Sequence, residues 1–282
     1  MKRITQKIPA KINLTLDVLG VTGGFHDLES MVASIDVYDK ITVTKRTDRV
    51  ITLKCKGLPV DCAPVDNNAY RAAKLFMERF NTTGVNIVIE KNIPVGGGLG
   101  GSSADIVGVL KCMQALFEKS EDLTDIANDL GSDCAYMLNG GFATMRGRGD
   151  KVEKLNIDKT LYLILIPEQK STSARLVYKA FDDMQKSFSP CTALALKALN
   201  DGDMHKFLAV IKNDLTDSAL SQVPEMNANL TALKKAGAPV ALMTGSGSCV
   251  YALFENEKQR NMAYKKLKNL YGKGLIKAKT II

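Results

Sequence analysis

The chain has 282 residues, of which 45% are hydrophobic and 24% are charged, so it is large enough for two modest globular domains. Lysine plus arginine exceed aspartate plus glutamate by eight, which favours anionic ligands such as nucleotides. Nucleic acid would attract the same charge, but the basic residues form no dense block and no RNP, KH or zinc-finger signature accompanies them. We therefore expect no nucleic-acid partner.

The sequence also argues against membrane, zinc-binding and disulfide-rich classes. No apolar run approaches the roughly 20 residues of a membrane span, and the stretch MKRITQKIPAK has no apolar segment after its charges. The six cysteines are scattered without a CxxC pair, and there are only two histidines. We expect a soluble protein with reduced thiols, located in the cytoplasm and without a membrane partner.

The first half predicts strands and helices in a mixed order. Apolar and polar residues alternate over residues 12–18, which predicts a half-buried strand with Lys11 and Asn13 side by side on its polar face. The stretches DVYDKITVTKR and RVITLKCKG predict two more strands, and a helix is expected from about Ala69. A strand over residues 85–90 leads into a glycine run, and a helix follows with Ser102 or Ser103 in capping position.

Further along, LTDIANDL predicts a short helix closed by Gly131, and GGFATMRGRGDKVEKL predicts a hairpin. A charged stretch at residues 153–160 marks a change of unit, so we place one domain at residues 1–155 and a second at 156–282. The second begins with the strand LYLILI, continues with several helices and a strand pair around MTGSGSCVYALF, and ends with a helix in EKQRNMAYKKLKNL. The absence of a regular βαβ rhythm predicts an α+β fold in both units.

The glycine run PVGGGLGGSSA joins a strand to a helix, and several of its alternative interpretations fail. A dinucleotide-binding unit needs a buried strand that ends in an acidic residue about 20 positions later, whereas the chain has EKSEDLTDIANDL there. No lysine follows as in a Walker A loop, and neither HRD nor DFG occurs as in a protein kinase. A tight turn needs fewer glycines. The remaining interpretation is an anion cradle for a polyphosphate, to which the serine hydroxyls add donors or a magnesium contact.

The stretch PVGGGLGGSSAD resembles the PxxxGLGSSAA phosphate loop of the GHMP kinases, and PAKINLTLDV and MTGSGSCVYALF resemble the first and third motifs of that family. The resemblance implies a two-domain GHMP kinase fold, with an ATP-binding domain resembling ribosomal protein S5 domain 2 and a ferredoxin-like C-terminal domain. It also implies ATP and Mg²⁺ as cofactors. PAKINL, GFHDLESM, IDVYDKI, LGSDCAYML and GRGDKVEKL are similar to the branch that phosphorylates the 2-hydroxyl of a methylerythritol carrying a cytidine diphosphate, in isoprenoid precursor biosynthesis.

The same resemblance assigns two catalytic residues. Asp133, in LGSD, matches the catalytic aspartate, which would accept the proton of the attacking hydroxyl. From the sequence alone, Asp133 is equally suited to cap a helix that begins at Cys134 or Ala135. Lys11, in PAKINL, would keep that aspartate ionised and stabilise charge on the transferred phosphoryl group, although a strand lysine is ordinarily exposed. Asn13 would hold either the substrate or Lys11.

The remaining implied residues bind substrate and cofactor. Phe25 and His26 match an aromatic–histidine pair that binds cytosine; phenylalanine in place of the usual tyrosine retains stacking but loses a phenolic hydrogen bond. Tyr178 is either a second aromatic residue at the cytosine or a core tyrosine. Asn67 and Lys91 match positions near adenine. The implied phosphate-binding residues are Pro94, Val95, Gly96, Gly97, Gly98, Leu99, Gly100, Gly101, Ser102, Ser103 and Ala104, with Ser103 as the candidate metal contact.

Several positions depart from the family pattern. Ile106 and Val107 are bulkier than the usual alanines after the loop, Ser248 and Cys249 replace the usual pair in the third motif, and the second half matches the family thinly. Two alternatives therefore remain: a GHMP kinase with another small-molecule acceptor, and a non-catalytic nucleotide-binding protein on this fold. The sequence is compatible with a monomer or a homodimer.

Overall fold

The structure is a computed structural model that describes residues 2–184 and 189–282. Its chain forms two compact units that interleave along the sequence, because strands β1 (Arg3–Asn13) and β3 (Phe25–Lys45) each supply residues to both. The domain boundary expected after residue 155 stays a prediction. The first unit contains Met1–Ala10, Val37–Val95 and Gly100–Gly140, and the second contains Lys11–Asp36, Gly96–Leu99 and Gly141–Ile282.

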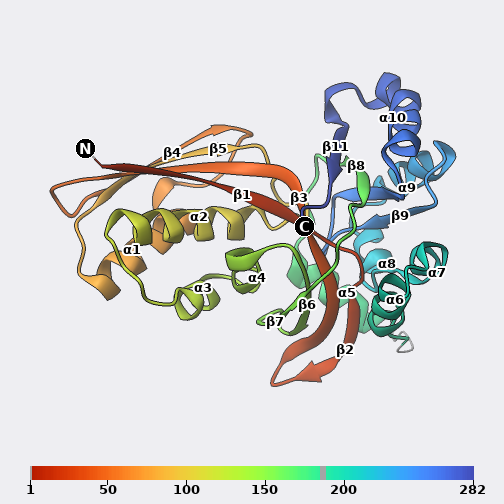
Figure 1. Cartoon of the computed structure of the whole chain (residues 1–282), viewed down its shortest axis with the longest axis horizontal. Coiled ribbons are helices and arrows are strands. Elements are labelled where there is room, and N and C mark those ends of the chain that lie inside the picture. Colours follow the sequence, from red (N-terminus) through yellow and green to blue (C-terminus); the bar gives the residue numbers. More distant parts are fainter. Residues whose placement is uncertain (1, 185–188) are drawn as a thin grey trace. The chain divides into compact units, whose positions relative to one another are not determined.

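The first unit packs helices on a short sheet. Strand β5 (Val85–Lys91) pairs in parallel with β4 (Ile51–Gly57) and antiparallel with residues 40–45 of β3. Figure 1 shows α1 and α2 lying along this sheet. A Cβ on Gly108 would lie 2.6 Å from the Ile41 side chain, so α2 packs directly on β3. The helical segments are η1 (Pro64–Asp66), α1 (Asn68–Phe80), α2 (Gly101–Leu116), α3 (Thr124–Leu130) and α4 (Cys134–Asn139).

The second unit contains the remaining strands of a seven-stranded sheet that continues through β3 from the first unit, and a separate four-stranded sheet. Residues 28–33 of β3 pair with β6 (Phe142–Gly147), which pairs with β7 (Lys151–Leu155), while β2 (Asp17–Thr22) pairs with the start of β3. The other sheet is antiparallel in the order β11 (Ile276–Lys279), β8 (Tyr162–Ile166), β10 (Val250–Phe254) and β9 (Val240–Met243). The helical segments are α5 (Ala174–Asp183), α6 (Thr192–Asn200), α7 (Met204–Val210), α8 (Thr216–Leu220), α9 (Met226–Lys235), α10 (Glu257–Tyr271) and η2 (Gly272–Gly274).

The strand expected over residues 12–18 is wrong in its limits and in its exposure. Strand β1 ends at Asn13 and β2 begins at Asp17. The polar face that alternation placed in solvent is buried, because its side chains find partners far along the chain. Thr15 Oγ1 lies 2.7 Å from the hydroxyl of Thr192, and the Asp17 carboxylate accepts from the N–H of Thr192 at 2.8 Å. Alternation alone could not reveal that a segment some 175 residues later covers this face.

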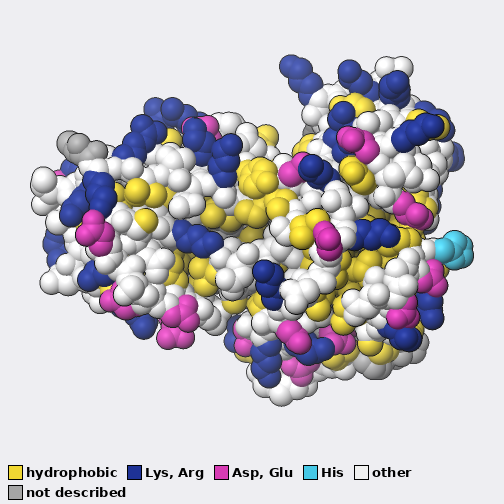
Figure 2. Space-filling view, in the orientation of Figure 1, with side chains coloured by type: hydrophobic (Ala, Val, Ile, Leu, Met, Phe, Trp, Pro, Cys, Tyr) yellow, Lys and Arg dark blue, Asp and Glu magenta, His cyan; other side chains and the backbone are white. Residues whose placement is uncertain are grey.

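Two features of the described chain concern its helices and its surface charge. Within the described ranges, no helix is both long and apolar enough to cross a bilayer. On the face drawn in Figure 2, lysine and arginine side chains are spread among acidic and neutral ones over both units.

Candidate active site

The glycine loop has a backbone that requires glycine at its centre. Gly98 has φ of +74°, and a Cβ there would lie 2.2 Å from the carbonyl oxygen of Thr244. Gly100, also at +74°, is the N-cap of α2, so the expectation that Ser102 or Ser103 caps the helix is wrong. Both serines lie in the first turn, and no side chain caps the helix. The positive end of the helix dipole thus meets the loop without a competing capping group.

In the second unit, the first and third motifs hold the centre of this loop by its backbone. The N–H of Lys11 donates to the carbonyl of Leu99 at 3.0 Å, and the N–H of Cys249 donates to the carbonyl of Gly97 at 3.3 Å. The hydroxyl of Thr244 donates to the carbonyl of Gly98 at 3.3 Å. These three contacts occupy carbonyl groups of the loop. They therefore do not compete for its N–H groups, which are the groups that bind an anion in a loop of this kind.

Lys11 is buried, contrary to the ordinary expectation for a strand lysine. Its ammonium donates to Asn13 Oδ1 at 2.8 Å, and the same oxygen accepts from the N–H of Gly245 at 2.9 Å. The amide nitrogen of Asn13 donates to Ser30 Oγ at 2.8 Å. Asn13 therefore holds Lys11, which is one of the two roles left open for it, and orients the ammonium within a fixed polar network.

In the first unit, the LGSD segment lies beside a loop serine. A Cβ on Gly131 would lie 3.5 Å from Ser103 Oγ. Burial raises the pKa of the Cys134 thiol to about 11, opposed by a hydrogen bond with Ser103. Asp133 is the N-cap residue of α4, as the capping interpretation predicts, but its side chain makes no capping bond. The segment that carries the predicted base is thus next to the first turn of α2.

The predicted cytosine-binding residues lie in the second unit, in two separate ring contacts. The ring of His26 stacks on that of Tyr178, with centroids 4.6 Å apart and 25° between planes. The guanidinium carbon of Arg148 lies 3.8 Å from the ring centroid of Phe25, which is 52% exposed. Asp182 Oδ1 lies 2.8 Å from His26 Nε2. The sequence analysis missed Asp182, although its position one helical turn after Tyr178 was an available signal.

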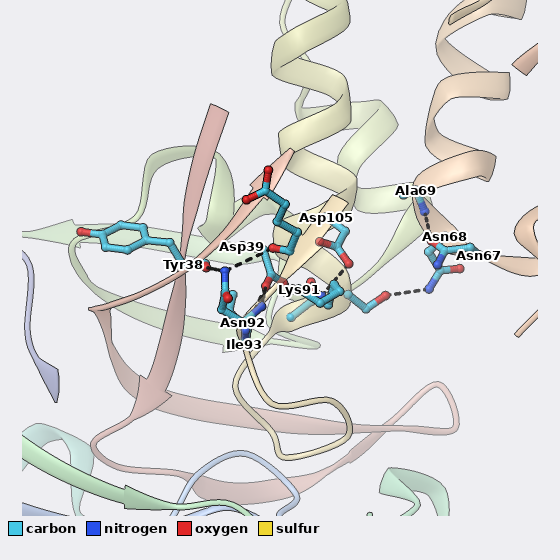
Figure 3. Close-up of polar contacts among 12 residues, drawn as sticks. Tyr38, Asp39, Asn67, Asn68, Ala69, Lys91, Asn92, Ile93 and Asp105 are labelled. Atoms are coloured by element: carbon cyan, nitrogen blue, oxygen red, sulfur yellow. Dashed lines mark hydrogen bonds and ion pairs between the residues drawn. The ribbon is translucent and has the colours of Figure 1, made fainter. Parts of the chain in front are cut away.

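The two residues predicted to lie near adenine make structural contacts in the first unit (Figure 3). Asn67 caps α1 by accepting from the N–H of Ala69 at 2.9 Å, and the next residue, Asn68, donates to Ser102 Oγ at 2.9 Å. The Lys91 ammonium is buried and donates to two carboxylates and a backbone carbonyl. These contacts use its three N–H donors. The adenine roles of Asn67 and Lys91 stay predictions.

A metal site has no dedicated ligand cluster in the part of the chain that the structure describes: no group of three or more His, Cys, Asp or Glu side chains is arranged to hold an ion. The predicted metal contact of Ser103 is untested. A magnesium ion that arrives with a nucleotide takes most of its ligands from phosphate and water, so it does not require such a cluster.

Comparisons with known proteins decide the family. The model of the GHMP kinases N terminal domain matches residues 67–145, and that of the GHMP kinases C terminal domain matches residues 195–273. A protein of Streptococcus equi subsp. zooepidemicus named putative 4-diphosphocytidyl-2-C-methyl-D-erythritol kinase is 34% identical, with all of both chains covered. The kinase of that name from Clostridium beijerinckii is 35% identical over 94% of this chain and 96% of its own. The chain belongs to the 4-diphosphocytidyl-2-C-methyl-D-erythritol kinase family.

Solved structures agree with membership in this GHMP kinase family. A crystal structure of 4-(cytidine 5'-diphospho)-2C-methyl-D-erythritol kinase has a TM-score of 0.81 at 30% identity and covers 98% of each chain. The homoserine kinase of Cytophaga hutchinsonii (TM-score 0.75, 18% identity, 100% of this chain and 95% of that one) shares the fold. The predicted two-domain GHMP kinase fold is confirmed, including its C-terminal part, and the protein is a kinase that uses ATP.

Proposed function

We propose that this kinase transfers the γ-phosphoryl group of MgATP to the 2-hydroxyl of 4-diphosphocytidyl-2-C-methyl-D-erythritol, in cytoplasmic isoprenoid precursor biosynthesis. The observation that supports the acceptor is the stacked pair of His26 and Tyr178 in the second unit. A phenol ring stacked on an imidazole that is held by a carboxylate suits a flat, polar base such as cytosine. The full-length similarity to proteins of that name supports the same acceptor.

Different residues of the chain perform the separate parts of the proposed reaction. The loop of residues 94–104 and the amino end of α2 bind the phosphates, and Asn67 lies near adenine. Asp133 accepts the proton of the attacking hydroxyl, and the Lys11 ammonium, held by Asn13, stabilises negative charge in the transition state. The Ser103 hydroxyl, on the first turn of α2, fits a Mg²⁺ contact, and the ion would neutralise phosphate charge when bound.

The experiment is ADP release from MgATP by the purified protein, with the cytidine-linked methylerythritol, mevalonate, homoserine or galactose as acceptor. We expect turnover with the cytidine-linked acceptor alone. Asp133→Asn should lower kcat by about 10²–10⁴-fold, because the carboxylate no longer accepts the proton, while ATP affinity stays within a few-fold. Asp129→Asn, an exposed neighbour on α3, is the matched control and should behave as the wild type.

The other outcomes separate the two alternatives. Turnover with one of the other three acceptors would identify a GHMP kinase of different specificity. ATP binding without turnover on any acceptor would favour a nucleotide-binding protein that has lost catalysis. Full activity of Asp133→Asn would remove Asp133 from the role of base.

A further inference from the structure

Three buried charges connect three separate elements of the first unit. Asp39 lies on β3, Lys91 is the last residue of β5, and Asp105 lies in α2. The Lys91 ammonium donates to one carboxylate oxygen of Asp39 and, at 2.6 Å, to Asp105 Oδ2. All three side chains are at most 7% exposed. Figure 3 shows Lys91 reaching between the two carboxylates.

These charges bind both ends of the phosphate loop. Asp39 Oδ1 accepts from the backbone N–H of Asn92 at 2.6 Å and from that of Ile93 at 2.9 Å, immediately before the loop begins at Pro94. On the other side, Lys91 donates to the carbonyl of Gly101 at 3.4 Å, at the first residue of α2. One ammonium therefore joins the segment that enters the loop to the helix that leaves it.

Stability alone gives no reason for this arrangement. Two carboxylates share one buried ammonium, and apolar side chains of similar volume are often as stable as a buried ion pair. Among the described residues, Asp105 Oδ1 is a buried oxygen that has no hydrogen-bond partner. A costly polar cluster in which every element borders one loop indicates a role in placing that loop.

We propose that Asp39, Lys91 and Asp105 form a clamp that fixes the separation of the two ends of the phosphate loop, and that they act as positioning residues for the triphosphate. In this role the Lys91 side chain is not an adenine ligand. The inference rests on the proposed binding of ATP phosphates by the loop, but it does not depend on the identity of the acceptor. On this proposal, ATP binding depends on three residues that lie outside the loop itself.

The test compares the affinities of ATP and adenosine by calorimetry. Asp39→Asn keeps an oxygen that can accept from both N–H groups, but replaces the oxygen facing Lys91 with an amide donor. Asp105→Asn weakens the contact to α2. We expect each variant to bind ATP about tenfold or more weakly, because misplaced donors lose charge-assisted bonds to phosphate, while adenosine affinity stays within about twofold.

Glu90→Gln is the matched control. Glu90 precedes Lys91 on β5 and pairs with Lys40 at 3.0 Å, on the partly exposed side of the same two strands. Its variant should bind both ligands as the wild type does. An equal loss of ATP and adenosine affinity in the clamp variants would instead identify Lys91 as an adenine contact, and unchanged ATP affinity would refute the clamp.

A measurement on the wild type keeps the inference testable if a clamp variant does not fold. The amides of Asn92 and Ile93 should exchange slowly with deuterium in the absence of nucleotide, because their N–H groups are bound to a buried carboxylate. Exchange at the rate of an unstructured loop would overturn the clamp. Failure of the proposed acceptor would appear only in the turnover assay and would leave these binding and exchange results unchanged.

Discussion

Replacing Gly98 with alanine should inactivate the enzyme without unfolding it. The added Cβ would lie 2.2 Å from the Thr244 carbonyl oxygen, where ordinary contact begins at 3.4 Å. The new Cβ and the Thr244 carbonyl oxygen are both fixed to the backbone, so no side-chain rotation can separate them. The loop must therefore move by about 1 Å. A displacement of about 1 Å at a catalytic site can cost about 100-fold in rate. We expect kcat/KM for ATP to fall by about that factor.

Gly23→Ala separates this clash from backbone strain. Gly23 has φ of +59°, but a Cβ there meets nothing within 4 Å. It should lose about 1–2 kcal/mol of unfolding free energy, as expected for a left-handed residue, and keep its activity. The assays are ADP release at varied ATP concentration and urea denaturation. The reasoning is refuted if Gly98→Ala keeps kcat/KM for ATP within about threefold of wild type.

Three further predictions concern stability and thiol chemistry. Burial raises the pKa of Asp105 to about 7. Between about pH 4 and pH 7, the folded protein therefore retains a proton on Asp105 that the unfolded chain releases. The free energy of unfolding should fall over this range as pH rises, by up to about 4 kcal/mol. Asp105→Asn should flatten that slope in urea titrations, and an unchanged slope would contradict the assignment. Iodoacetamide at about pH 7.5 should label the exposed Cys62 first, as mass spectrometry can show, because burial raises the pKa of the Cys112 thiol to about 12; prior labelling of Cys112 would contradict this order. Asp17→Ala should cost about 3 kcal/mol in denaturant unfolding because two buried N–H groups lose a carboxylate, and Asp17→Asn should cost less; equal losses would count against the hydrogen bonds as the cause.

Local patterns in the sequence were sufficient for the parts of the site that are themselves local. The glycine loop between β5 and α2 follows from residue types that only a strand-to-helix turn around an anion would combine. Gly131 ends α3 as its position after a periodic segment predicts. Asp133 was correctly placed before a helix, but the sequence could not decide between a cap and a base, because the same residue type serves both.

Long-range partners could not be predicted. Asp39 and Lys91 are 52 residues apart, and His26 and Asp182 are 156 apart, so no periodicity relates them. The buried polar face of Lys11 and Asn13 was misjudged for the same reason, since its covering residues come from the far end of the chain. In each case the missing information is which distant donor or acceptor offsets the cost of burying a polar group.

The interleaving of the two units limits how this kinase can be divided or recombined. The hydrophobic core of the second unit includes Leu16 and Val18 beside residues such as Ile164 and Phe254. A fragment that started at residue 156 would lack two members of its own core and the strands that carry them. Acceptor specificity therefore cannot be transplanted between relatives by exchanging C-terminal halves; a chimera would have to carry residues 11–36 along with residues 141–282.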